Sequence, residues 1–381
     1  MNFSIIFEAQ LANPTRERER RLLRDCVEQA VYAVQMGFDR VWAVEHHALK
    51  WYAHMSAPEI FLATVAAKTS RIRIGHGVVC MAFNYNFPTR VAERAAMLDV
   101  LSDGRVDLGA GRGGTTQEMS LCNVDPDRTT DEVEEALRIL SAIWTNETFE
   151  WHGDLLTIES PEGNSPHTVV PRPVQEPHPP LYLACTRPET VQRAAEYGVG
   201  ALAFGFAGPE HVRMQRRLYD EARASRTGDR YVSSVINDHF AALCPTIVLD
   251  DAAQAREIGA RAQRFFGESI NHWARGAAEP ADFTEGDDNV AVMARGMDAM
   301  RLQVERGELS EDQFSLAASA FNIDHAYGTY ETAVEYVEQL QDAGVDEVMC
   351  IMQMGTVPHE VCIETLRQWG EHVIPRFRGD A

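Results

Sequence analysis

The sequence predicts a single (β/α)8 barrel over residues 1–381, because eight short apolar segments alternate with eight longer amphipathic segments. The apolar segments are nearly continuous, which is typical of parallel strands buried on both faces. Hydrophobic residues make up 45% of the chain, enough for a sizeable core. An open doubly wound sheet is the alternative architecture, and it usually contains fewer repeats of this kind.

Each repeat begins with an apolar run and continues into a helical pattern with recognisable ends. A glycine, Gly37, ends the first helix, and Pro58 lies in the first turn of the second. The expected strands are residues 3–7, 39–44, 71–80, 105–111, 180–185, 200–206, 233–244 and 345–353. The expected helices are residues 16–36, 57–68, 88–101, 130–144, 188–197, 209–223, 251–266 and 358–377.

Two stretches interrupt this alternation and predict insertions. Residues 145–180, before the fifth strand, contain "TFEWHGDLLTIES", which alternates like a hairpin, and then a proline-rich run. Residues 267–324, after the helix that follows the seventh strand, are long and acidic, so we expect a lid or a surface insertion there.

Charge and composition exclude several classes of protein. Lys and Arg number 35 and Asp and Glu 57, a net charge of −22, which repels nucleic acid and anionic membranes, so an anionic ligand needs a local positive site. No apolar run reaches transmembrane length, and "MNFSIIFEAQ" lacks the basic flank of a secretory signal. The seven cysteines are scattered without a CxxC motif, so we expect a cytoplasmic protein.

The second strand ends in Glu45, His46 and His47. In such a barrel the carboxyl ends of the strands form the active face, and a neutral imidazole there could accept a proton or donate a hydrogen bond. A zinc-dependent hydrolase would want His-x-His rather than adjacent histidines, so we expect no metal site. The other interpretation is a loop histidine satisfied by backbone.

Two further motifs predict an anion site. "VDLGAGRGGTTQE" (residues 106–118) runs from the fourth strand into glycines and Arg112, with no amphipathic helix immediately after them, so a dinucleotide fingerprint is not indicated. After the fifth strand, Thr186, Arg187 and Thr190 surround a helix start, where free N–H groups favour an anion. Ordinary turns, a solvated arginine and N-capping by Thr186 are the alternatives.

In the third strand, "RIRIGHGVVC", Gly75 and Gly77 indicate close approach of a ligand or of backbone, so a flat aromatic ring could lie there. Aromatic residues on the loops after strands two and three suggest an apolar pocket, although they could equally be lid and core residues. They are Trp51, Tyr52, Phe83, Tyr85 and Phe87.

Taken together, the sequence resembles the bacterial luciferase-like family of flavin-dependent monooxygenases. The matching segments are "GFDRVWAVEHH", "TSRIRIGHGVV", "NFPTRVAERAAMLDVLSDGRVDLGAGRG", "PETVQRAAEYG" and "GVDEVMCIMQMGTVPHE", in order along nearly the whole chain. The resemblance implies reduced FMN at the barrel mouth and O2 as co-substrate. It also implies a partner reductase that supplies the FMN, a homodimer, and a small to medium apolar substrate.

The resemblance also assigns roles to residues. Arg112 and the turn Thr186, Arg187 and Thr190 would hold the FMN phosphate. The flavin ring would stack near Gly77 and Val78, where the family often has a non-prolyl cis peptide. His46 would work near the flavin, and Glu45 would help to position it.

The chain departs from the family pattern in two places. "TR" stands where relatives often carry serine or a carboxylate, and Gly111 replaces a reactive cysteine, so aldehyde light emission is not implied. Three other functions stay open: a deazaflavin (F420) dependent oxidoreductase of the same fold, a flavin-binding protein without catalysis, and a metal-dependent hydrolase barrel.

Overall fold

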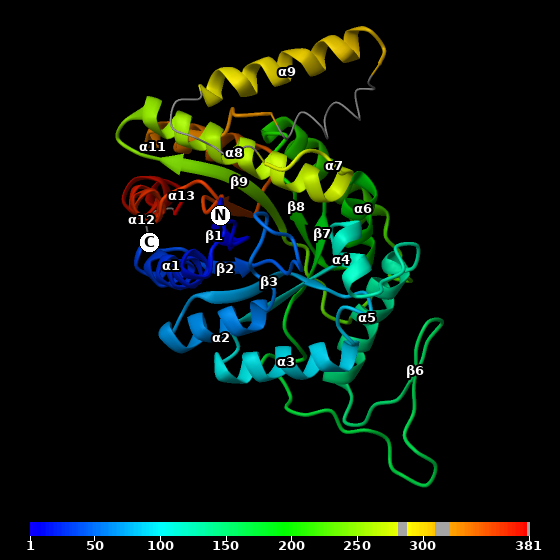
Figure 1. Ribbon diagram of the computed structural model, residues 1–381. Coiled ribbons are helices and arrows are strands. Elements are labelled where there is room, and N and C mark those ends of the chain that lie inside the picture. The colour runs from blue at the N-terminus through cyan, green and yellow to red at the C-terminus, as the bar shows by residue number, and fades with distance from the viewer. Residues whose placement is uncertain (281–287, 309–320, 379–381) are drawn as a thin grey trace.

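The computed structural model describes residues 1–280, 288–308 and 321–378. In these ranges eight parallel strands close into a barrel, each paired with the next and the last with the first, which confirms the predicted (β/α)8 fold (Figure 1). In barrel order they are β1 (Asn2–Phe7), β2 (Arg40–Ala43), β3 (Arg73–Cys80), β4 (Val106–Gly111), β7 (Leu181–Cys185), β8 (Gly200–Ala203), β9 (Phe240–Val248) and β11 (Glu347–Ile351).

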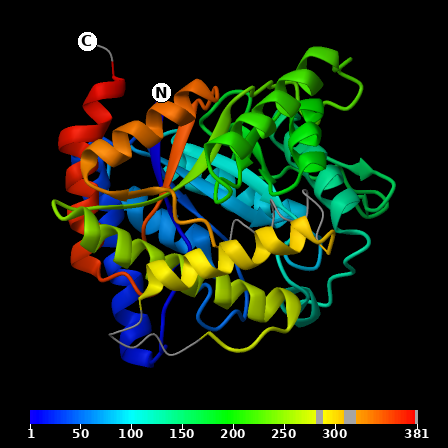
Figure 2. The ribbon, with the colours of Figure 1, turned by 90° about the horizontal axis from the view of Figure 1, so that it is seen from above.

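Helices surround the strands, as the view from above shows (Figure 2). Gly37 follows the first helix with φ +85°, as its sequence position predicts. The helices are α1 (Arg16–Gln35), α2 (Pro58–Lys68), α3 (Pro88–Leu101), α5 (Thr129–Thr145), α6 (Pro188–Tyr197), α7 (Pro209–Ser225), α8 (Ala252–Arg275), α11 (Tyr330–Asp342) and α12 (His359–Gln368). After α12, a π-helical turn (Trp369–Val373) and α13 (Ile374–Phe377) complete the range expected for one last helix.

The seventh barrel strand differs from its expected range. β9 covers Phe240–Val248 rather than residues 233–244, and all nine of its residues are buried. Pro245 interrupts the apolar run in the sequence, but it lies where β9 stops pairing with β11 and starts pairing with β10 (Ala326–Gly328). A proline can stand at that change of partner because it has no N–H group to leave unpaired. Both β10 and α11 were missed by the sequence pattern.

The two interrupting stretches contain secondary structure of their own. In residues 145–180, β5 (Trp151–His152) and β6 (Thr157–Ile158) form an antiparallel hairpin that projects at the lower right of Figure 1. In residues 267–324, α8 continues to Arg275 and α9 (Asn289–Glu305) packs on α8. Residues 281–287 and 309–320 lie outside the described residues, so the lid stays a prediction, as does the single-domain division of the chain.

An ion cluster fills the barrel where the strands begin. Arg40 Nε donates to Asp107 Oδ2 at 2.7 Å, and the same guanidinium also pairs with Glu347. Trp42 Nε1 donates to Glu347 Oε1 at 2.8 Å. A Cβ on Gly75 would come within 2.2 Å of the Trp42 indole, so this glycine makes room for a core tryptophan. The flat ring that lies against Gly75 is therefore the indole of Trp42, a side chain of the protein itself.

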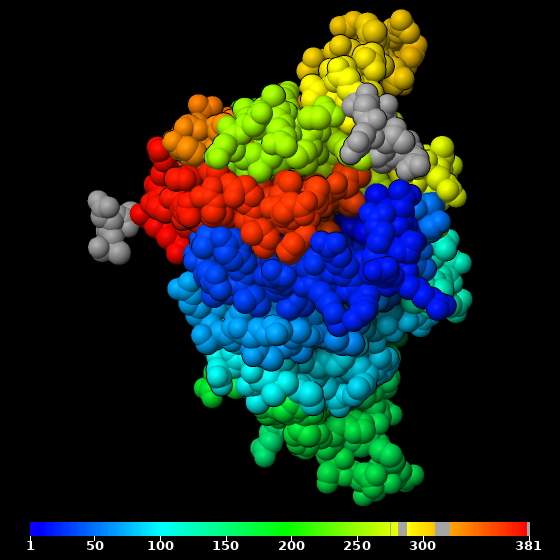
Figure 3. Space-filling view, turned by 60° about the vertical axis from the view of Figure 1, so that its left-hand side comes forward, coloured from blue at the N-terminus to red at the C-terminus, as the bar shows by residue number. Residues whose placement is uncertain are grey.

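Helices α1, α2 and α3 lie side by side as blue to cyan bands on one face (Figure 3). A cavity of about 1010 Å³ between α1 and α2 has apolar side chains along it, among them Leu23 and Ile60. The homodimer expected from the family stays a prediction. Among the described residues, no helix is both long enough and apolar enough to cross a membrane.

Candidate active site at the mouth of the barrel

Glu45 forms hydrogen bonds that link the segment after β2 to the end of β3. Its carboxylate accepts from the Cys80 N–H at 2.9 Å, from Asn86 Nδ2 at 2.8 Å and from His47 Nε2 at 2.9 Å. Burial alone would raise the pKa of Glu45, but these hydrogen bonds outweigh burial and hold the pKa below its usual range. Glu45 thus contacts His47 directly rather than His46, and its expected role in positioning His46 stays a prediction.

His46 is instead held by Glu118. The distance from His46 Nδ1 to Glu118 Oε1 is 2.8 Å, and an ionised carboxylate can only accept, so Nδ1 carries the proton. The other ring nitrogen, Nε2, faces Glu8 Oε2 at 3.8 Å. Burial alone would lower the pKa of His46, but the hydrogen bond to Glu118 and the charges of Glu118, Glu8 and Glu45 outweigh burial and raise it.

Glu118 belongs to a short helix, α4 (Thr116–Leu121), that the sequence analysis missed. Thr115 and Glu118 form a capping box, in which Glu118 Oε2 accepts from the Thr115 N–H at 2.9 Å. The signal was present as T-x-x-E directly after the glycines. Burial alone would raise the pKa of Glu118, but the hydrogen bond from His46 outweighs burial and lowers it. A buried carboxylate thus fixes the orientation of His46.

Tyrosine rings flank both histidines. The Tyr52 ring lies edge-on to His46 with ring centroids 5.3 Å apart, and Tyr85 stacks on His47 at 5.7 Å. Trp51 instead belongs to a small separate cluster of buried hydrophobic residues. Two of the five aromatic residues expected near a pocket therefore lie beside the histidines.

The wall next to the histidines is formed by β3 and β4. The peptide bond Gly77–Val78 is cis, as the family resemblance implies. A Cβ on Gly111 would come within 2.4 Å of Val78 Cγ2, and one on Gly109 within 2.5 Å of the His76 carbonyl oxygen. The glycines of β4 thus leave room for the backbone of β3 and for the side chain of Val78.

We predict that Gly111→Ala lowers the free energy of unfolding by about 1–3 kcal/mol, because the added methyl group overlaps Val78. Equilibrium denaturation measures the change. Adding Val78→Ala to the variant removes the overlapping methyl groups, so the double variant should lose less than the sum of the two single variants. Simple additivity would show that Val78 does not require the glycine.

The predicted cationic site contains two guanidinium groups that have no side-chain partner in the described part of the chain. Neither Arg112 nor Arg187 has a hydrogen bond or ion pair from its side chain within residues 1–280, 288–308 and 321–378. Burial and the nearby charge of Arg187 lower the pKa of Arg112. An anion that contacts both guanidinium groups would offset this repulsion.

The start of α6 differs in detail from the expectation. Arg187, not Thr186, is the N-cap, and its N–H donates to Thr190 Oγ1 at 3.2 Å. The Thr190 hydroxyl in turn donates to the Arg187 carbonyl at 2.8 Å, while Thr186 is exposed. Thr190 therefore shapes the turn, and the Thr186 hydroxyl stays available to a ligand.

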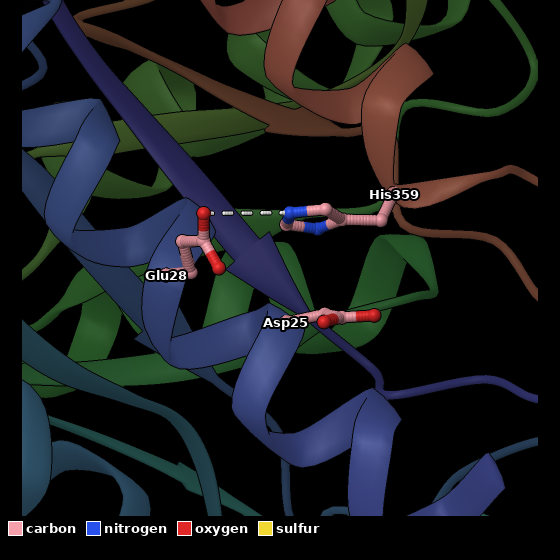
Figure 4. A group of neighbouring side chains, drawn as sticks. All are labelled: Asp25, Glu28 and His359. Carbon is pink, nitrogen blue, oxygen red and sulfur yellow. Dashed lines mark ion pairs between the residues drawn. The ribbon is translucent and has the colours of Figure 1, made fainter.

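One group among the described residues could hold a metal ion, and it lies outside the Glu-His-His motif. Asp25 and Glu28 of α1 and His359 at the start of α12 place ligand atoms within 4.8 Å of one another (Figure 4). Ion pairs account for this group, since Asp25 pairs with Arg21 at 3.4 Å and His359 Nε2 lies 3.7 Å from Glu28. His46 and His47 contact different carboxylates, which does not favour shared metal ligation.

The fold and these residues define a (β/α)8-barrel protein with a candidate active site at the carboxyl ends of its strands. The chain matches the model of the luciferase-like monooxygenase family over residues 1–347. It therefore belongs to that family, as the sequence resemblance indicated.

Three curated relatives share 27–33% identity with the chain. They are a 4-hydroxyprotoasukamycin monooxygenase from Streptomyces nodosus subsp. asukaensis (33% over 193 residues), the oxygenase component of a flavin-dependent trigonelline monooxygenase from Acinetobacter baylyi (27% over 202) and an F420-dependent glucose-6-phosphate dehydrogenase from Amycolatopsis mediterranei (29% over 193). The matches cover 48%, 52% and 49% of this chain and 47%, 52% and 55% of the relatives. The chain thus spans about half the length of these relatives.

Solved structures share the fold over the whole chain. Monooxygenase RslO1 from Streptomyces bottropensis superposes with a TM-score of 0.76 at 22% identity, covering 99% of this chain and 100% of that one. The oxygenating constituent of 3,6-diketocamphane monooxygenase from Pseudomonas putida, in complex with FMN, gives 0.70 at 17% identity, covering 99% and 98%. Both flavin-dependent and F420-dependent enzymes occur among the curated relatives.

Proposed function

We propose that the chain is the oxygenase component of a two-component flavin monooxygenase. It would take reduced FMN from a separate reductase and use O2 to oxygenate a small to medium apolar substrate. The observation that carries this proposal is a pair of guanidinium groups, Arg112 and Arg187, that have no partner among the described residues of a chain with a net charge of −22. The acidic tail of a cofactor can contact both guanidinium groups at the mouth of the barrel.

The residues at the mouth fit FMN in two respects. Arg112, Arg187 and the Thr186 hydroxyl can hold a phosphate, together with the free N–H groups at the start of α6. The β3 wall at Gly77 and Val78 can contact the ring, and Val78 is partly exposed there. Reduced FMN, when bound, supplies the electrons that activate O2.

The chemistry left to the protein is proton handling and exclusion of water. Glu118 holds the Nδ1 proton of His46, which leaves Nε2 to accept or donate a proton at the reacting group. Tyr52, which is buried, shields the ring from water. Glu45 acts through His47, which stacks on Tyr85, and thus shapes the pocket wall.

The reductase partner is supported by the relative named as an oxygenase component. F420 is the alternative cofactor, favoured by the F420-dependent relative and by the same two guanidinium groups, since the tail of F420 is also acidic.

Anaerobic titration with reduced FMN and with reduced F420, followed by O2 and a panel of apolar substrates, tests the proposal. We expect tight binding of reduced FMN and less hydrogen peroxide per FMN oxidised when a substrate is present. Preference for F420 with turnover that needs no O2 would establish the alternative. Binding of FMN with no substrate effect would indicate a flavin-binding protein without catalysis.

A further inference from the structure

A buried carboxyl group that no sequence motif indicated lies on the far side of the His46 ring. Glu8 directly follows β1, and 8% of its surface is exposed. Its Oε2 has no hydrogen-bond partner within the described part of the chain, and it lies 3.8 Å from His46 Nε2. His46 is therefore placed between two carboxyl groups, Glu118 at Nδ1 and Glu8 at Nε2.

The two carboxyl groups differ in what surrounds them. Glu118 is tied by hydrogen bonds from His46, from the His47 N–H and from Thr115, which stabilise its ionised form. Glu8 Oε2 has no such donor among the described residues, and the ionisable groups that interact with Glu8 there are His46, Glu118 and Tyr52. Burial raises the pKa of Glu8 to about 7, with Glu118 adding to the effect and His46 opposing it. Near neutral pH, Glu8 can therefore hold or release a proton.

We propose that Glu8 is a positioning residue that controls the protonation of His46 Nε2. The proton passes from Glu8 Oε2 to His46 Nε2 and leaves a carboxylate beside an imidazolium whose Nδ1–H donates to Glu118. At 3.8 Å the two atoms lie just beyond hydrogen-bond length, and a small side-chain rotation closes the gap. The role of this proton in oxygenation rests on the proposed function, whereas the coupling of the two groups is a property of the flavin-free protein.

The sign of the effect follows from charge. Ionised Glu8 stabilises the imidazolium and is one of the causes that raise the pKa of His46. Glu8→Gln removes that charge and keeps the size of the side chain, so the pKa of His46 must fall. Glu8→Asp keeps the charge, so it should restore most of the pKa.

The chain offers a matched control in the pair formed by Glu28 and His359 (Figure 4). His359 Nε2 lies 3.7 Å from Glu28 Oε1, nearly the same separation, but the Glu28 side chain is 68% exposed. Solvent and salt screen such a pair, so Glu28→Gln should leave the pKa of His46 unchanged.

Histidine NMR titration of the full-length, flavin-free protein measures these pKa values, with His46→Gln to assign the resonance. We expect Glu8→Gln to lower the pKa of His46 clearly, at low and at high salt, with the other histidines unchanged. A His46 pKa that stays the same in Glu8→Gln, in a protein whose other histidine signals show it folded, would overturn the proposal. The proposal would also be overturned if Glu28→Gln lowered the pKa of His46 as much as Glu8→Gln does.

A second measurement separates this proposal from the proposed function. With reduced FMN and O2, the pH at which product yield falls should move to lower values in Glu8→Gln and return towards the original in Glu8→Asp. If the NMR shift occurs but no substrate is oxygenated at any pH, the coupling of Glu8 to His46 stands and the proposed monooxygenase function fails.

Discussion

Arg40→Met is expected to lower the free energy of unfolding by about 3–5 kcal/mol, because it leaves two buried carboxylates without their shared cation. Asp107 and Glu347 are both fully buried, and they join β4 and β11 through this one guanidinium. Arg73 still donates to Asp107 at 2.7 Å, so the loss is concentrated at Glu347. Methionine fills a similar volume, so the loss of charge and hydrogen bonds dominates the effect.

Chemical denaturation followed by circular dichroism measures this loss. Arg90→Met is the matched control, because Arg90 forms an ion pair with Glu93 on the surface and its side chain is 66% exposed. Such a pair contributes less than about 1 kcal/mol. If the two variants lose the same stability, the cluster at the base of the barrel is not what holds β2, β4 and β11 together.

His46→Ala is expected to slow substrate oxygenation by about 10²–10⁴-fold, the usual loss when a positioned acid or base is removed. The reason is geometric: Glu118 holds His46 Nδ1 at 2.8 Å, so Nε2 presents a proton donor or acceptor in one fixed direction. Binding of reduced FMN should change much less, because the predicted phosphate contacts come from β4 and α6. More hydrogen peroxide per FMN oxidised should accompany the slower oxygenation.

Rapid mixing of the enzyme and reduced FMN with oxygenated substrate gives both the rate and the product yield. His47→Ala is the comparison, since the His47 side chain contacts Glu45 and Tyr85, while only its backbone N–H donates to Glu118. We expect a smaller loss there. Equal rates and equal yields for His46→Ala and the unaltered protein would remove His46 from the mechanism.

The parts of the fold that the sequence predicted are those with local signals. Apolar runs, prolines at helix starts and Gly37 at a helix end each act within a few residues, and they located the eight barrel strands and most of the surrounding helices. The carboxyl end of β9 was misplaced because Pro245 resembles the end of a strand when the pairing of β9 with β10 is not known.

The candidate site was only partly predictable for a related reason. Glu-His-His and Arg112 stand out as motifs, and Glu118 carried a capping-box signal that was overlooked. Glu8 had none, because a single acid after an apolar strand becomes informative only when the parallel pairing of β1 with β2 is known. Arg40 and Glu347 likewise carry no local signal in the sequence. They are 307 residues apart in the chain and come together only in the assembled barrel.

Arg112→Ala tests the central claim, that this guanidinium anchors the phosphate of a flavin at the barrel mouth. The decisive measurement is the affinity of the unaltered protein and the variant for reduced FMN and for reduced riboflavin, which lacks the phosphate. We predict a loss of about 1–3 kcal/mol for FMN, roughly 5- to 150-fold, and almost none for riboflavin. Unchanged FMN affinity, or an equal loss for both flavins, would contradict the assignment.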